Sequence, residues 1–322
     1  MRKQYDVIAL GELLIDFTEN GYSIQGNPMM EVNPGGAPCN LLSMLGRLGK
    51  KTSFLGMVGK DQFGALLKSA AKEMKIDTGH LYEHESVHTT LAFVHTMADG
   101  DRQFAFYRNP GADMMLEEKH VDPAYIKSAK ALHYGTLSMT HEGIWKATVK
   151  AIDIAKEAGM ILSFDPNLRP PLWDNLEDAK LKMRYGFSKC DLLKISEEEL
   201  EFATGRTNIE EGADKLLEEF PNIKLMNVTM GKHGSLACYQ GRKVFGHPFV
   251  MEHTIETTGA GDCFGGCILN DILNRGFENL TDEELLNMLE FANAAAALVT
   301  TRKGALKVMP TKAEVEELLK RK

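Results

Sequence analysis

The sequence predicts an α/β protein in which a mostly parallel sheet is covered by helices on both faces. Short apolar runs of strand length alternate with longer amphipathic segments of helical period along most of the 322 residues. Such alternation is typical of a parallel sheet, because parallel strands need helical crossovers. No internal repeat, low-complexity stretch or linker divides the chain. We therefore expect one domain spanning 1–322.

Composition narrows the class of function. The net charge is −8 and no basic stripe is visible, which argues against nucleic acid as a partner. No run approaches the ~18 apolar residues of a membrane span, and the N-terminus lacks the apolar core of a signal peptide. Five scattered cysteines indicate free thiols in a reducing compartment, so we expect a cytoplasmic protein. Cys263 and Cys267 lie one helical turn apart, but without a second ligand pair they do not predict a metal site.

The first strand is expected at Tyr5–Leu10, and the apolar run that follows places Asp16 at its end. An acid at the carboxyl end of a strand lies where α/β sheets bind ligands, although a simple turn acid has the same pattern. Residues 18–33 are polar and contain glycine, which predicts irregular or hairpin structure outside the main layers.

A helix is expected after Gly35 and Gly36, with Pro38 in its first turn and Gly49 at its end. Asn40 would lie one turn into this helix, where its amide could reach a ligand. The spacing of the glycines differs from the dinucleotide-binding fingerprint, which disfavours a dehydrogenase.

A strand at 52–58 and a helix at 61–75 follow. His80, His84 and His88 recur every four residues, as metal ligands on a helix would, but the segment has weak helical periodicity and is expected to be a surface connection. Residues 89–96 and 102–107 alternate around a turn at 98–101, which predicts a β-hairpin. This hairpin either packs aromatic side chains on the core or covers a pocket into which Arg108 reaches.

The rest of the chain repeats strand and helix. Strands are expected at 131–134, 160–164, 190–195, 225–230, 235–239 and 243–245. Helices are expected at 141–158, 175–189, 197–204, 210–219 and 281–299, and a last one from 310 onward. A further helix, opened by the stretch 255–264, is expected to end at 275.

The stretch Ile255–Phe264 leads from polar β-branched residues through Gly259, Ala260 and Gly261 to Asp262 and a buried helix. Unpaired N–H groups at a helix start attract anions, and small residues let an anion approach them. The stretch therefore offers an anion hole beside a carboxylate base. A glycine-rich helix cap with an acidic first turn would have the same appearance.

Residues 35–40 and 257–262 together resemble the two signatures of the ribokinase-like, or phosphofructokinase-B-type, sugar kinase family, and the resemblance covers nearly the whole chain. Within that family, residues 106–114 and 165–173 are most similar to fructokinases. The resemblance implies a three-layer α/β/α sandwich with a small β-sheet lid at roughly 13–33 and 89–108. It also implies that ATP phosphorylates the 6-hydroxyl of D-fructose.

The family implies a role for each matching residue. Asp262 would be the base, and the amides of Gly259, Ala260 and Gly261 would hold the transferring phosphoryl group. Sugar contacts would come from Asp16, Gly35, Gly36, Asn40, Phe106, Arg108 and Arg169. Nucleotide contacts would come from Lys194, Thr229, Gly231, Gly234 and Asn293. Mg²⁺ would accompany ATP, and K⁺ is a further ion to expect beside Glu256 and the loop that ends at Gly304.

Two positions depart from the family pattern. Glu256 stands where Asp is usual, which puts the monovalent-cation site in question. The metal-associated Asn-x-x-Glu motif is matched by Lys194-Ile195-Ser196-Glu197, which makes Glu197 the candidate Mg²⁺ ligand but departs from the motif at its first position.

Rival functions are a kinase for another sugar, above all 2-keto-3-deoxygluconate, whose carboxylate Arg108 and Arg169 could bind. A catalytically silent sugar-binding regulator is a rival of a different class. Exposed edges of the lid strands also predict a homodimer formed through the lid.

Overall fold

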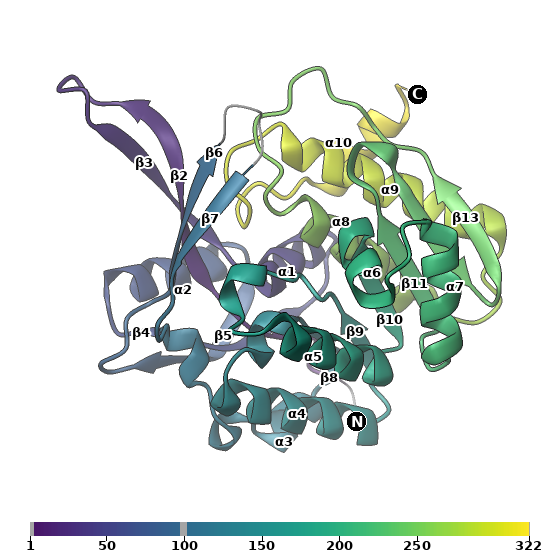
Figure 1. The fold of residues 1–322 in the computed structure, drawn as a ribbon, viewed down its shortest axis with the longest axis horizontal. Helices are drawn as coiled ribbons and strands as arrows, with labels where there is room; N and C mark the ends of the chain where they lie inside the picture. Colours follow the sequence, from purple (N-terminus) through teal and green to yellow (C-terminus); the bar gives the residue numbers. More distant parts are fainter. Residues whose placement is uncertain (1–2, 97–101, 322) are drawn as a thin grey trace.

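The computed structural model describes residues 3–96 and 102–321 and contains two sheets (Figure 1). The larger sheet has nine strands in the order β13-β12-β11-β10-β9-β8-β1-β4-β5. All its neighbours pair in parallel except β12 and β13, which extend one edge as antiparallel strands. The strands are β1 Tyr5–Leu10, β4 Thr52–Gly59, β5 Ile76–His84, β8 Ala129–Tyr134, β9 Ile161–Phe164, β10 Leu192–Ser196, β11 Leu225–Thr229, β12 Ser235–Tyr239 and β13 Arg242–Gly246. The predicted α/β class and mostly parallel sheet are confirmed.

Helices cover both faces of this sheet, because its central strands bury apolar side chains on both sides. In β1, Val7 and Ala9 enter one core and Ile8 and Leu10 enter the other, and all four are fully buried. The first core is covered by α1 Ala37–Arg47, α2 Gln62–Glu73, α8 Ala260–Arg275, α9 Asp282–Thr300 and α10 Lys312–Leu319. The second core is covered by α3 Pro123–Lys127, α4 Glu142–Glu157, α5 Leu176–Lys189, α6 Glu197–Thr204 and α7 Ile209–Glu219.

Single turns of 3₁₀ helix complete the connections. They are η1 Ala112–Met115, η2 Glu118–His120, η3 Thr136–Met139, η4 Pro170–Leu172 and η5 Gly231–His233.

The second sheet has the order β3-β2-β6-β7, from β2 Leu14–Tyr22, β3 Pro28–Gly35, β6 Leu91–Thr96 and β7 Arg102–Tyr107. The hairpin of β2 and β3 projects away from the body of the molecule (Figure 1). We call this second sheet the lid sheet. The hairpin predicted within residues 18–33 and the strand pair near 89–107 are both confirmed, while the turn predicted at 98–101 lies outside the described residues.

The segment with His80 and His84 differs from the prediction. It forms β5, the edge strand of the main sheet, where we expected a surface connection. An irregular register between β4 and β5 interrupts the alternation of buried and exposed residues along this strand. His80 stacks on Tyr125 with ring centroids 3.4 Å apart, so its role here is packing.

All five cysteines are free and buried, as expected. Across residues 3–96 and 102–321, no helix is both long and apolar enough to cross a bilayer.

Candidate active site

Two glycine-led helix starts meet at the carboxyl ends of the strands. Helix α1 begins after Gly36, whose φ is 121°, and α8 begins after Gly259, whose φ is 82°. Side chains strongly disfavour both backbone conformations, so glycine is required at each turn. Near the start of each helix, Asn40 Nδ2 donates a hydrogen bond of 2.8 Å to Asp262 Oδ2. The two distant motifs therefore form one site.

A cleft of about 690 Å³ opens over this contact, and we call it the main cleft. The walls come from β10, from the starts of α1, α6 and α8, and from the lid sheet through Asp16 and Phe106. It is lined by the predicted residues Asp16, Gly36, Asn40, Phe106, Arg169, Lys194, Glu197, Thr229, Gly231, Gly259, Gly261 and Asp262.

A second cavity of about 390 Å³, the side cavity, adjoins the main cleft. The two share four lining residues, Thr229, Gly231, Thr257 and Gly261. Predicted residues Gly234, Ala260 and Asn293 line the side cavity alone. Two substrates bound in the two cavities would therefore meet at the start of α8, beside Asp262.

Burial raises the pKa of Asp262 to about 6, and the nearby charge of Asp165 adds to this effect. The hydrogen bond from Asn40 and the cations Lys194 and Arg169 act in the opposite direction. A carboxylate whose pKa lies near the working pH is suited to general-base catalysis, since it can both accept and release a proton. The environment of Asp262 therefore fits the role of base.

Lys194 lies on the main-cleft floor, in an ion pair that sequence reasoning missed. Its Nζ is 3.0 Å from Asp165 Oδ2, and both side chains are largely buried. Adjacent parallel strands β9 and β10 bring the two residues side by side, a proximity that their 29-residue separation conceals. The sequence signal was an acid directly after strand β9.

The buried acid of α6 is Glu199 rather than Glu197, which was the predicted metal ligand. Both line the main cleft, but Glu199 accepts from the Leu168 amide at 2.7 Å and from the Ser196 amide at 2.9 Å. Glu199 closes a capping box with Ser196, a serine-x-x-glutamate signal present in the sequence.

Glu12 was also missed, although it directly follows strand β1. It lines the main cleft, and its Oε1 accepts from the Ala37 amide at 2.9 Å, which holds the start of α1. Burial raises the pKa of Glu12 to about 8, and Asp113 contributes to this rise.

Four predicted residues, Gly35, Arg108, Glu256 and Gly304, lie outside the linings of both cavities. A side chain at Gly35 would collide with the Asp16 carboxylate, so Gly35 makes room for that acid. Glu256 Oε2 accepts from the Gly304 amide at 3.0 Å, which brings the two expected monovalent-cation residues together. No group of three or more metal-binding side chains occurs within the described ranges.

The family model for the pfkB family carbohydrate kinases matches residues 4–312. The chain belongs to this family. The predicted resemblance and the ribokinase-like fold are therefore confirmed.

The three relatives described next are all named fructokinases. "Probable fructokinase-2" of Arabidopsis thaliana is 40% identical over 318 residues, which cover 98% of this chain and 95% of that protein. A fructokinase with bound ATP from Xylella fastidiosa is 30% identical, with a TM-score of 0.88 and 98% of each chain covered. A fructokinase double mutant from Vibrio cholerae O395, bound to fructose, ADP and potassium, is 29% identical, with a TM-score of 0.87 and 99% of each chain covered.

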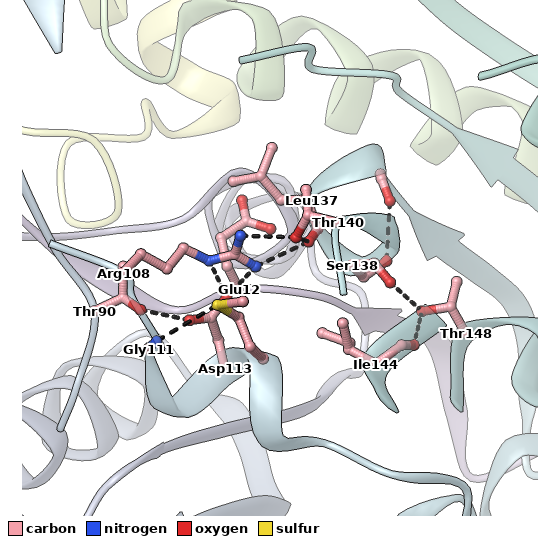
Figure 2. A network of polar contacts seen from close by, with 12 residues as sticks. Glu12, Thr90, Arg108, Gly111, Asp113, Leu137, Ser138, Thr140, Ile144 and Thr148 are labelled. Atoms are coloured by element: carbon pink, nitrogen blue, oxygen red, sulfur yellow. Dashed lines mark hydrogen bonds and ion pairs between the residues drawn. The ribbon is translucent and has the colours of Figure 1, made fainter. Parts of the chain in front are cut away.

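Arg108 lies elsewhere in this kinase than the sequence suggested. Its guanidinium is held between Asp113 and the turn from Leu137 to Thr140 (Figure 2). Distances are 2.7 Å to Asp113 Oδ2, 2.8 Å to Thr140 Oγ1 and 2.9 Å to the Leu137 carbonyl. Arg108, expected to reach into the cleft, does not line it in this structure, because the buried Asp113 carboxylate and two further acceptors bind its donors.

The Asp113 carboxylate also accepts a hydrogen bond of 2.5 Å from Thr90 Oγ1. Thr90 immediately precedes β6 and Arg108 immediately follows β7. The Asp113 carboxylate therefore binds both chain segments that connect the β6–β7 strand pair to the rest of the molecule. We therefore predict that this pair positions the lid sheet instead of binding sugar directly.

Arg108→Ala and Asp113→Ala should each cost about 3–5 kcal/mol of unfolding free energy, because each leaves a buried charge unpaired. The double variant should cost less than the sum of the two, since the partners are removed together. Urea unfolding followed by circular dichroism measures this cycle. Arg184→Ala, which breaks an exposed pair with Glu219, is the control and should cost below about 1 kcal/mol. Additive losses at Arg108 and Asp113 would contradict the coupling.

Proposed function

We propose that this chain is an ATP-dependent fructokinase that transfers the γ-phosphoryl group of ATP to the 6-hydroxyl of D-fructose. The observation that carries the proposal is the position of Asp262 at the junction of two cavities, at the start of a glycine-led helix. The fructokinase names of the relatives, and the ATP, fructose and ADP in the two solved structures, support the substrates.

Fructose would occupy the main cleft on the α1 side, and ATP would occupy the side cavity with its phosphates at α8. Asp262 would take the proton of the attacking hydroxyl, and Asn40 would orient its carboxylate. The first amides of α8 would stabilise the charge on the transferring group, since positioning and electrostatics dominate phosphoryl transfer. Gly36, Asp16 and Phe106 would bind or enclose the sugar, and Asn293 would lie near the adenine.

The alternative substrate, 2-keto-3-deoxygluconate, needs a cation for its carboxylate. Arg169 lines the main cleft and favours this alternative. Arg108, however, is held behind the lining by Asp113. The carboxylate of Asp16 lies on the sugar side and would repel an acidic substrate. A neutral sugar therefore fits the cleft better.

Mg²⁺ would enter with the phosphates of ATP, because this ion is usually held by one or two carboxylates together with phosphate oxygens and water. Glu197 and Glu199 line the main cleft at the start of α6 and suit that role. For K⁺, the contact of Glu256 with Gly304 supports a site beside α8, as does the potassium-bound relative. The fit is partial, since one Glu256 oxygen already accepts an amide.

A substrate panel with ATP and Mg²⁺ tests the assignment. D-fructose should give the highest kcat/KM among fructose, glucose, ribose and 2-keto-3-deoxygluconate, and added K⁺ should raise the rate. A preference for the keto acid would replace the proposed substrate. Sugar binding without turnover of any member would instead revive the silent regulator.

Asp262→Asn should lower kcat by ~10²–10⁴-fold, the usual contribution of a general base. The KM for fructose should change little, because an Asn oxygen can still accept from Asn40. In the unsubstituted enzyme, kcat should fall as pH drops through about 6, since Asp262 must be unprotonated to act as base. Initial rates between pH 5 and 9 measure both effects. Asp271→Asn, in the same helix, is the control and should keep the parent kcat. Near-normal turnover of Asp262→Asn would refute the assignment of Asp262 as the base.

We further propose a homodimer formed through the lid sheet. Its large apolar side chains Tyr22, Ile24, Met29, Val32 and Tyr107 are exposed in the single chain. A sheet edge or face of this kind is a common site of pairing between identical chains. A cytoplasmic location remains a prediction.

Val32→Glu combined with Tyr107→Glu should convert a dimer into a monomer, because two charges per chain would be buried at the interface. Sedimentation velocity of the variant and the parent protein measures the change. Phe245→Glu places the same charge on β13, at the far edge of the main sheet, and should leave the dimer intact. A parent protein that sediments as a monomer would contradict the proposal.

A further inference from the structure

Lys194 is largely buried and bound by both carboxylate oxygens of Asp165. Its side chain is 13% exposed and its Nζ contacts both oxygens of Asp165, at 3.0 and 3.2 Å. Asp165 follows β9 directly and Lys194 belongs to the neighbouring strand β10. The rigid sheet therefore determines where this ammonium lies, instead of a mobile loop.

The same ammonium lies directly against the first turn of α8. A Cβ atom built at Gly261 would lie 3.1 Å from Lys194 Nζ and 3.5 Å from its Cε. Gly261 is between Ala260 and Asp262, so the cation adjoins both the anion-binding amides and the carboxylate base. Absence of a side chain at position 261 is what allows this approach.

Charges around Lys194 keep it protonated. Burial lowers the pKa of its ammonium, but Asp165, Glu199 and Asp262 raise it, and the net result is a pKa above the ordinary value. Three carboxylates surrounding one ammonium leave the main cleft floor acidic. A polyphosphate arriving there needs every available cation, and this one is already fixed in place.

We propose that Lys194 is a further catalytic residue whose ammonium contacts the phosphoryl group during transfer, and that Asp165 is its positioning residue. The proposal rests on the kinase function proposed above. As the γ-phosphoryl oxygens reach the start of α8, the ammonium would share its three donors between them and Asp165. Charge on the transferring group would then be stabilised by a preformed cation as well as by backbone amides.

Lys194→Gln should lower kcat by ~10²–10³-fold, the usual effect of removing one donor that stabilises the transition state. The KM for the sugar should change by less than about threefold, because the lysine is proposed to stabilise the transition state and not the bound sugar. Lys224→Gln is a matched control: Lys224 also forms an Asp–Lys pair of 3.0 Å, with Asp191, near the opposite ends of β10 and β11. That control should keep the parent kcat, and thermal melts would show that each variant is folded.

The pH profile distinguishes two roles of Lys194: contact with the phosphoryl group, and an effect on the pKa of Asp262 alone. Lys194 helps to lower the pKa of Asp262, so Lys194→Gln should also move the acid limb of kcat to higher pH. If the lysine only tunes the base, kcat would recover fully on the high-pH plateau, and the proposal would be overturned. The proposal requires the loss to persist on that plateau.

Asp165→Asn provides a second variant, should Lys194→Gln fail to fold. It should reduce kcat by roughly tenfold without changing the sugar KM, since the ammonium is retained but less well oriented. Its acid limb should move to lower pH, the opposite direction, because Asp165 raises the pKa of Asp262. An unchanged kcat in this variant would refute the positioning role.

These assays use whichever sugar the parent enzyme accepts best in the substrate panel. A preference for another sugar would alter the proposed function and leave the Lys194 test intact. Parent activity with fructose, together with full plateau activity of Lys194→Gln, would refute this inference alone.

Discussion

The hydrogen bond between Asn40 and Asp262 is the contact on which the site depends. It joins residues 222 positions apart and requires α1 and α8 to pack closely at their starts. Gly266 permits this approach, since a Cβ there would lie 3.0 Å from Met44 Cβ and 3.1 Å from the Leu41 carbonyl. Close packing of two helices thus aligns the proposed sugar side with the proposed phosphate side, and small errors in it would misplace the proposed base, Asp262.

Negative charge is concentrated where a negatively charged substrate must bind. Asp165, Glu199 and Asp262 surround Lys194, and the pKa of Asp262 is raised by burial first and by the charge of Asp165 second. The cost of gathering carboxylates in a partly buried cleft is offset by the lysine and by backbone amides. The charges at the site therefore suit cations together with phosphate, which is why a fixed ammonium beside the first amides of α8 matters.

The lid sheet and the body are connected through a buried ion pair. Arg108 and Asp113 are 7% and 1% exposed, and Thr90 completes the contact from the other lid strand (Figure 2). Breaking such a pair is costly, even where the intact pair adds little net stability. The arginine thus joins the lid sheet to Asp113 and to the turn from Leu137 to Thr140.

Sequence patterns alone were enough to predict the α/β class, most helices and strands, the two glycine-led helix starts and the base candidate Asp262. These features depend on local periodicity and on backbone conformations that only glycine readily adopts, so nearby residues encode them. Only the tertiary structure decided which charged side chains pair. The Lys194–Asp165 pair, the burial of Glu199 in place of Glu197 and the withdrawal of Arg108 toward Asp113 each depend on neighbouring strands or distant turns. Such pairings follow from sheet order and burial, which spacing along a single chain does not reveal.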